Sequence, residues 1–315
     1  MNQENAQSLL LCIGGAHLDR KAVSQTKVIL GSSNPAVVME TCGGVARNVA
    51  ETVARLGGCV SLLSRVGQDR MGERVMAGTK RAGVDVQLVD ISPTARTGTY
   101  TALIDQGGEL VVSFADMVIY EEMTVAWIEP YWPEIRGASL VFLDANLPEE
   151  TLRYVIERCR RERVPVCVNP VSALKAPKVK ACLAGMEMLF ANREEAEALA
   201  GRSILSLADA KAVAADLVGQ GVRHVFLTLG EEGVLCASSD ELLHLPASTV
   251  TVVDTTGAGD AFVAGVLVRW LHGAGCLESA RFGLAVARLA LQTIDNVTTE
   301  LNFERIQQGL KGESA

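Results

Sequence analysis

The most regular feature of the chain is a series of short apolar runs, each bounded by polar or glycine-rich turns. Most runs are followed by a stretch in which apolar residues recur at helical spacing. Such alternation of strand and helix predicts right-handed βαβ units and a mostly parallel sheet. The predicted strands are Leu9–Ile13, Val60–Val66, Leu140–Leu143, Val164–Asn169, Met188–Ala191 and His224–Thr228.

The sequence pattern predicts three helices especially clearly. The segment Gly44–Leu56 gathers its valines on one face and is followed by two glycines, which stop a helix. Glu194–Ala200 ends in the same way at Gly201. Between Phe262 and Leu271 apolar residues again repeat at helical spacing. The pattern therefore predicts an α/β fold.

Two β-rich segments depart from this rhythm. Thr97–Ile104 and Leu110–Ala115 alternate or are β-branched, and the glycine-containing segment between them predicts a hairpin turn. The region 17–42 is also β-rich and has no helical period. We expect both segments to leave the main sheet as a small separate sheet. Because no linker, repeat or low-complexity tract appears, we expect one core domain over residues 1–315.

Composition narrows the class of protein. Of the 315 residues 49% are apolar and only 4% aromatic, which suits a sheet buried under helices on both faces. The net charge is −8 without a basic stripe, so we expect no nucleic-acid partner. The eight cysteines form no C-x-x-C pair, and the first apolar run is too short for a signal peptide or membrane span. These features predict a cytoplasmic protein that does not bind membranes.

The segment most suggestive of chemistry is a strand, a glycine-rich turn and an apolar helix over Val250–Phe262. The small residues Gly257-Ala258-Gly259 let the backbone approach a ligand, and free N–H groups at a helix start stabilise developing phosphoryl charge. Asp260, at the mouth of the turn, is placed to accept the proton of an attacking hydroxyl. The alternative is an ordinary helix N-cap. The flanking acidic and hydroxyl residues favour the functional interpretation.

Two further clusters follow predicted strand ends. Gly43-Gly44 opens a helix that carries Asn48 four positions after Gly44, which suits a polar ligand or equally a solvent-facing helix start. Asp19 follows the first strand, where open α/β sheets bind ligands, although a lone aspartate there is more often a turn residue. Neither a dinucleotide fingerprint nor a P-loop occurs.

Two smaller groups complete the candidates. Asn192 and Glu195 lie within one helical turn and suit a hydrated Mg²⁺, with a helix-capping pair as the equal alternative. The turn from Thr228 through Gly230 to Gly233 suits a nucleotide phosphate, although hairpin turns look much the same. The four histidines are too scattered in sequence to indicate a zinc site.

Taken in order along the chain, these segments resemble the ribokinase-like (PfkB) carbohydrate kinases, and the resemblance covers nearly the whole chain. It implies a Rossmann-like αβα sandwich with a β-sheet lid formed by two insertions, at about 17–43 and 96–116. It also implies an ATP- and Mg²⁺-dependent kinase that phosphorylates a hydroxymethyl group of a small sugar or nucleoside. Homodimers are common in the family, whose lids often exchange or share active-site residues between subunits.

The resemblance also assigns roles residue by residue. Asp260 matches the general base, and the backbone of Gly257, Ala258 and Gly259 matches the anion hole. The sugar-binding positions match Asp19, Gly43, Gly44 and Asn48. The Mg²⁺ and phosphate motif matches Asn192 and Glu195, and the nucleotide-binding turn matches Thr228, Gly230 and Gly233. Asp254 and Thr256 match positions that hold a monovalent cation, usually K⁺, in many members.

Several short stretches resemble the branch of the family that phosphorylates pseudouridine. They include Ser33-Asn34-Pro35, Arg47 in the glycine–asparagine signature, Ala115-Asp116-Met117, and Asn169-Pro170-Val171-Ser172 with Lys175. The chain departs from that branch at Ala115 and Asn169, where asparagine and aspartate are expected. The resemblance adds Asn34 and Asp116 to the expected substrate-binding residues. Kinases of adenosine, inosine or ribose, and a silent nucleoside-binding protein, remain the alternatives.

Overall fold

A computed structural model describes residues 9–293, 296–299 and 301–312 of the chain. Its largest feature is a nine-stranded sheet with the order β13-β12-β11-β10-β9-β8-β1-β4-β5. The strands from β11 to β5 pair in parallel, whereas β12 and β13 join antiparallel at the other edge. The strands are β1 (Leu9–Ile13), β4 (Cys59–Gly67), β5 (Val89–Ser92), β8 (Leu140–Asp144), β9 (Val166–Asn169), β10 (Met188–Asn192), β11 (His224–Thr228), β12 (Val234–Ala237) and β13 (Leu242–Leu245).

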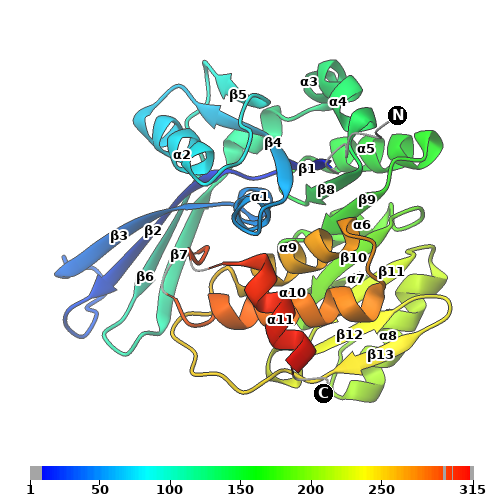
Figure 1. Cartoon of the computed structure of the whole chain (residues 1–315). Helices are drawn as coiled ribbons and strands as arrows, with labels where there is room; N and C mark the ends of the chain where they lie inside the picture. The colour runs from blue at the N-terminus through cyan, green and yellow to red at the C-terminus, as the bar shows by residue number, and fades with distance from the viewer. Residues whose placement is uncertain (1–8, 294–295, 300, 313–315) are drawn as a thin grey trace.

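Helices cover both faces of this sheet, so the predicted αβα sandwich is confirmed (Figure 1). One face packs against α4 (Trp132–Gly137), α5 (Glu149–Glu162), α6 (Ala176–Lys180), α7 (Arg193–Ala200) and α8 (Leu207–Gly219). The other packs against α1 (Val45–Arg55), α2 (Arg70–Arg81), α9 (Ala258–Leu271), α10 (Cys276–Ala290) and α11 (Phe303–Gly312). The short helix α3 (Val125–Ile128) precedes α4, and short 3-10 helices span Val118–Glu122, Glu129–Tyr131 and Gly230–Glu232.

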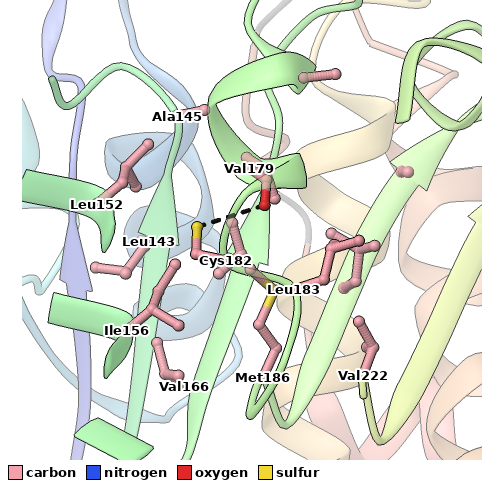
Figure 2. Close-up of a cluster of buried hydrophobic side chains, with 14 of the residues drawn as sticks. Leu143, Ala145, Leu152, Ile156, Val166, Val179, Cys182, Leu183, Met186 and Val222 are labelled. Carbon is pink, nitrogen blue, oxygen red and sulfur yellow. Dashed lines mark hydrogen bonds between the residues drawn. The ribbon is translucent and has the colours of Figure 1, made fainter. Parts of the chain in front are cut away.

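Successive side chains of the central strands point to opposite faces of the sheet, so the interior is divided into two hydrophobic cores. In β1, Leu11 and Ile13 belong to one core, whereas Leu10 and Cys12 belong to the other. Figure 2 shows part of the first core, where Cys182 lies among aliphatic side chains and donates to the carbonyl of Val179 at 3.4 Å. Such continuous burial on both faces explains why the central strands are apolar runs without polar alternation.

A second, four-stranded sheet projects from the sandwich, as the β-rich segments predicted (Figure 1). Its order is β3-β2-β6-β7, with β2 and β6 parallel and the outer pairs antiparallel. Its strands are β2 (His17–Ser24), β3 (Ala36–Gly43), β6 (Thr99–Ile104) and β7 (Leu110–Asp116). We call this sheet the lid sheet. It begins directly after β1, so it stands beside the carboxyl ends of the central strands.

The main sheet reverses its direction of growth between β1 and β8. Successive strands β1, β4 and β5 extend it one way, and β8 to β11 extend it the other way. Open α/β sheets bind their ligands at the carboxyl ends of the strands beside such a switch point. Within the described ranges, none of the helices combines the length and apolar character needed to cross a bilayer.

Candidate active site

The glycine turn forms the start of α9, as the sequence predicted. Gly257 adopts a left-handed conformation with φ of 79° and forms the N-cap of the helix, without a side-chain cap. A Cβ at this position would lie 2.0 Å from the carbonyl oxygen of Asn296, so both backbone angle and space require glycine. Gly259, by contrast, faces open space. No side chain caps this helix start, and the N–H of Ala258 donates to the carbonyl of Thr255 at 3.3 Å.

Asp260 lies in the first turn of α9 and is largely enclosed, with a small exposed part. Desolvation raises the pKa of its carboxyl group to about 7, and the charges of Asp144, Asp19 and Glu195 act in the same direction. Asn48 opposes them by donating from Nδ2 to Asp260 Oδ2 at 2.8 Å. A carboxylate whose pKa lies near neutrality is suited to accept and release a proton.

The orientation of Asn48 is fixed by its neighbour in α1. Arg47 Nη1 donates to Asn48 Oδ1 at 2.8 Å and to the carbonyl of Cys42 at the same distance. Because a guanidinium group can only donate, the amide oxygen must face Arg47 and the amide nitrogen must face Asp260. Arg47 is buried and also pairs with Glu51 on the next turn of the helix. This chain of contacts therefore favours the ionised form of Asp260.

Asp19, in β2, is buried at the foot of the lid sheet. Asn296 donates to its Oδ2 at 2.6 Å, whereas Oδ1 lies 3.1 Å from His17 Nε2 without a well-aligned hydrogen bond. Gly43 is required beside it, because a Cβ there would come within 2.3 Å of the carboxylate. Oδ1 therefore keeps the capacity to accept a hydrogen bond from a polar ligand.

Asp144 organises the switch point from the end of β8. Its side chain is completely buried and accepts from the backbone N–H groups of Gly15 at 2.8 Å and Ala46 at 2.9 Å. Two residues after Asp144, the side chain of Asn146 accepts a hydrogen bond from Lys175, whose pKa is lowered by burial. The sequence analysis missed Asp144 and Asn146. Their position directly after a buried strand, which singled out Asp19, was the available signal.

Gly44 lies at the N-terminus of α1, against the backbone segment that contains Gly15. Its φ is 105°, and a Cβ there would lie 2.2 Å from the carbonyl oxygen of Gly15. The left-handed backbone angle and the close approach of the Gly15 segment explain why glycine follows glycine at this point.

Asp254 and Thr256 lie just before the glycine turn. Thr256 N donates to Asp254 Oδ1 at 2.8 Å, which closes the turn. From the lid sheet, Lys21 Nζ donates to Asp254 Oδ2 at 2.6 Å and to Thr256 Oγ1 at 2.9 Å. The two side chains that the resemblance assigns to a monovalent cation are thus bonded to a lysine.

Asn192 and Glu195 form a capping box at the start of α7. Asn192 Oδ1 accepts from the N–H of Glu195 at 2.8 Å, and Glu195 Oε2 accepts from the N–H of Asn192 at 2.9 Å. The capping alternative therefore describes their local structure. Glu195 is buried, and desolvation raises the pKa of its carboxyl group. A carboxylate and an amide oxygen are ligand types that Mg²⁺ accepts, and a nearby cation would stabilise the charged form of Glu195.

Two adjoining cavities meet at Gly259. The larger, about 1840 Å³, is bordered by the turn between β11 and β12, including Thr228, Gly230 and Gly233. The smaller, about 170 Å³, is lined by Asp260 and Glu195. Gly259, Asn192 and Thr228 line both. The turn at Thr228–Gly233 is a β-hairpin connection, as the alternative held, and it also borders the large cavity.

Two predicted residues lie outside the cluster around Asp260. Asn34 uses its side chain within the β2–β3 loop, where Oδ1 accepts from the N–H of Ile29 at 2.8 Å. Asp116 is exposed at the end of β7 and has no side-chain contact with this cluster among the described residues. Their substrate-binding roles stay predictions.

Comparison with known proteins identifies the family of this site. The family "pfkB family carbohydrate kinase" matches residues 7–300. The chain belongs to the pfkB family of carbohydrate kinases. It is accordingly a phosphotransferase with a hydroxyl group as acceptor.

Individual relatives act on different acceptors. The chain is 34% identical to a pseudouridine kinase from Escherichia coli (strain K12), over 90% of both chains. It is 28% identical to a guanosine-inosine kinase from Exiguobacterium acetylicum, over 90% of this chain and 94% of the relative. A ribokinase structure from Arabidopsis thaliana, complexed with ribose and ATP, superposes with a TM-score of 0.86 at 22% identity, covering 97% and 99% of the two chains. This last likeness shows the fold alone.

Proposed function

We propose that this kinase transfers the γ-phosphoryl group of ATP to the 5′-hydroxyl of pseudouridine, giving pseudouridine 5′-phosphate and ADP. The observation that carries the mechanism is the setting of Asp260. Its carboxyl group has a pKa raised to about 7, lies in the first turn of α9 and lines a cavity that adjoins a much larger one. A base, an electropositive helix start and space for two substrates therefore converge.

In this proposal Asp260 takes the proton of the attacking hydroxyl as its oxygen bonds to the γ-phosphorus. The bond from that phosphorus to the β-phosphate oxygen breaks, and ADP leaves. The backbone N–H groups at Gly257, Ala258 and Gly259 stabilise the charge that spreads over the phosphoryl oxygens. The hydrogen bond from Asn48 keeps part of the Asp260 population ionised near neutral pH.

The sugar of the acceptor lies, in this proposal, between Asp19 and the glycines of α1. The support is the buried Oδ1 of Asp19, which lacks a well-aligned donor and suits a ribose hydroxyl. Gly43 and Gly44 keep the space beside it free of side chains. Closure of the lid sheet over the sugar would exclude water and so limit hydrolysis of ATP.

We assign ATP to the larger cavity. Its volume of about 1840 Å³ and the glycine-containing turn at its border suit a nucleotide and its phosphates. Asn192 and Glu195, which line the adjoining small cavity, would hold hydrated Mg²⁺. The ion supplies neutralisation of phosphate charge when it is bound.

Pseudouridine is proposed as the acceptor because of the 34% identity to the Escherichia coli enzyme and because short stretches of this sequence resemble the branch of the family that phosphorylates pseudouridine. The second candidate is a purine nucleoside, since a guanosine-inosine kinase is 28% identical. Ala115 and Asn169 depart from the expected pseudouridine pattern, so base specificity is the part of the proposal that the acceptor panel tests. Acceptor choice in such pockets depends on a few polar contacts.

The test is ADP release from Mg·ATP with pseudouridine, uridine, adenosine, inosine and ribose as acceptors. A clear preference in kcat/KM for pseudouridine supports the proposal. Preference for inosine or adenosine would replace the acceptor and keep the mechanism, whereas ADP release that no acceptor increases would contradict both.

We also propose a homodimer formed through the lid sheet. Both edge strands of that sheet expose large apolar side chains, including Val37, Val38, Leu110 and Phe114. Exposed apolar edge strands are normally covered, and in this family a second subunit is the usual cover. Light scattering on wild type and a Phe114→Lys variant tests this: the wild type should have twice the mass of the chain, and a monomeric wild type would refute it.

A further inference from the structure

The positive charge beside the glycine turn comes from the chain itself. Lys21 extends from β2 of the lid sheet, two positions after Asp19 and therefore on the same face of the strand. Its ammonium group donates to Asp254 at 2.6 Å and to Thr256 at 2.9 Å. The lysine and the aspartate are 233 positions apart in sequence, so this bond joins the lid sheet to the segment that leads into α9.

A monovalent cation does not fit the side-chain oxygens of this turn as they stand. Asp254 Oδ1 already accepts from the N–H of Thr256, and Oδ2 accepts from Lys21. The hydroxyl oxygen of Thr256 accepts from the same ammonium. A potassium ion among these atoms would meet a like charge at short range, and the single negative charge of Asp254 is already balanced.

An ammonium group is a close substitute for potassium at such a place. The two have the same charge and similar size, and both attract carboxylate and hydroxyl oxygens. The bonds hold Asp254 in the turn whose next element is the left-handed Gly257, so the lysine acts on the helix start through this aspartate. Burial opposes ionisation of Asp254, yet the bond from Lys21, with that from Thr256, keeps its pKa below the ordinary value.

From this geometry we propose that Lys21 replaces the monovalent cation of the glycine turn, so that the kinase works without potassium. Lys21 is a positioning residue, because it contacts the turn and not the reacting atoms. The proposal rests on the proposed phosphoryl transfer only for its activity readout. It also links the lid to the turn, since the charge is present only when β2 lies against the Asp254 segment.

The experiment compares wild type, Lys21→Met and Lys27→Met in potassium chloride and in choline chloride at equal ionic strength. Lys27 is an exposed lysine of the loop that follows β2 and serves as the matched control. Initial rates are measured with the preferred acceptor of the panel. Wild type and Lys27→Met should be equally active in both salts. Lys21→Met should lose about tenfold or more in choline, the loss expected for a charge-assisted hydrogen bond, and potassium should restore most of it.

Three results would overturn the proposal. They are a wild type that potassium activates severalfold, a Lys21→Met variant that equals wild type in both salts, and a loss that potassium does not restore. The last result would assign Lys21 to lid attachment alone. Should Lys21→Met not fold, Lys21→Gln takes its place.

A second readout is independent of the proposed function. Thermal unfolding midpoints of the same proteins, measured with Mg·ADP, should not change between the salts for wild type. Potassium should raise the midpoint of Lys21→Met. If no acceptor is phosphorylated, the proposed function fails, while these midpoints still decide whether Lys21 stands in for the ion.

Discussion

Removing the amide of Asn48 should shift the titration of Asp260. Burial raises the pKa of Asp260 to about 7, and the bond from Asn48 acts against that rise. In Asn48→Ala the pKa should therefore increase further. A hydrogen bond to a charged group contributes about 1.5–3 kcal/mol and one pKa unit corresponds to about 1.4 kcal/mol, which gives about one to two units. Water entering the space replaces part of the bond, so we expect about one unit.

The assay is the pH dependence of kcat/KM for the acceptor at saturating Mg·ATP. A general base must be ionised, so activity should rise with pH through the pKa and then level off. The pH profile of the wild type should bend at a pH of about 7, and that of Asn48→Ala at a pH of about 8. Loss of a sugar contact in the variant lowers the plateau, but it does not move the bend.

Two outcomes would refute this reasoning. One is a bend at the same pH in wild type and Asn48→Ala, which would mean that the amide does not influence the base. The other is a wild-type profile that is flat from about pH 5 to 8, where a base of this pKa must titrate. Asp260→Asn serves as control, because its residual activity should show no such bend.

Three further predictions concern single groups of the site. The pKa of Asp260 rises on folding from an ordinary 3.8 to about 7, so ionisation of its carboxyl group lowers the stability of the folded protein as the pH increases through that window. Asp260→Asn should therefore raise the unfolding midpoint at pH 8, and this gain should vanish toward pH 4. Calorimetry that shows the same gain at both pH values would contradict this prediction. Gly257→Ala should lower the midpoint by a few degrees because its Cβ meets Asn296, whereas Gly259→Ala, with open space, should leave the midpoint unchanged and weaken kcat/KM for ATP. Glu195→Gln should raise the Mg²⁺ concentration for half-maximal rate by roughly tenfold, and an unchanged Mg²⁺ titration would remove Glu195 from that role.

Local patterns were sufficient to predict the layers of the fold. Buried strands such as Leu9–Ile13 and His224–Thr228 agree with the structure to the residue, because parallel strands covered on both faces are uninterrupted apolar runs. The helix starts at Gly44 and Gly257 were legible because left-handed backbone requires glycine. The hairpin β12–β13, with four-residue strands at the sheet edge, gave too short a pattern to be predicted.

The site was predicted less completely because its bonds span long distances in sequence. Asn296 lies 277 positions from Asp19, and no periodicity relates them. Lys21 lies in a β-rich segment whose pattern does not single it out, although its partner is Asp254. The Asn192–Glu195 pair shows the converse case, in which the residues are close in sequence. A helix capping box explains this local motif as well as a binding site does, so the motif alone does not indicate a function.

The most direct test of the central claim is single-turnover transfer of labelled γ-phosphate from ATP to the acceptor by wild type and Asp260→Asn, alongside equilibrium binding of the acceptor. If Asp260 is the base, the variant should bind the acceptor within a fewfold of wild type and transfer phosphate about 10²–10⁴ times more slowly. A transfer rate near that of wild type would contradict the assignment of Asp260.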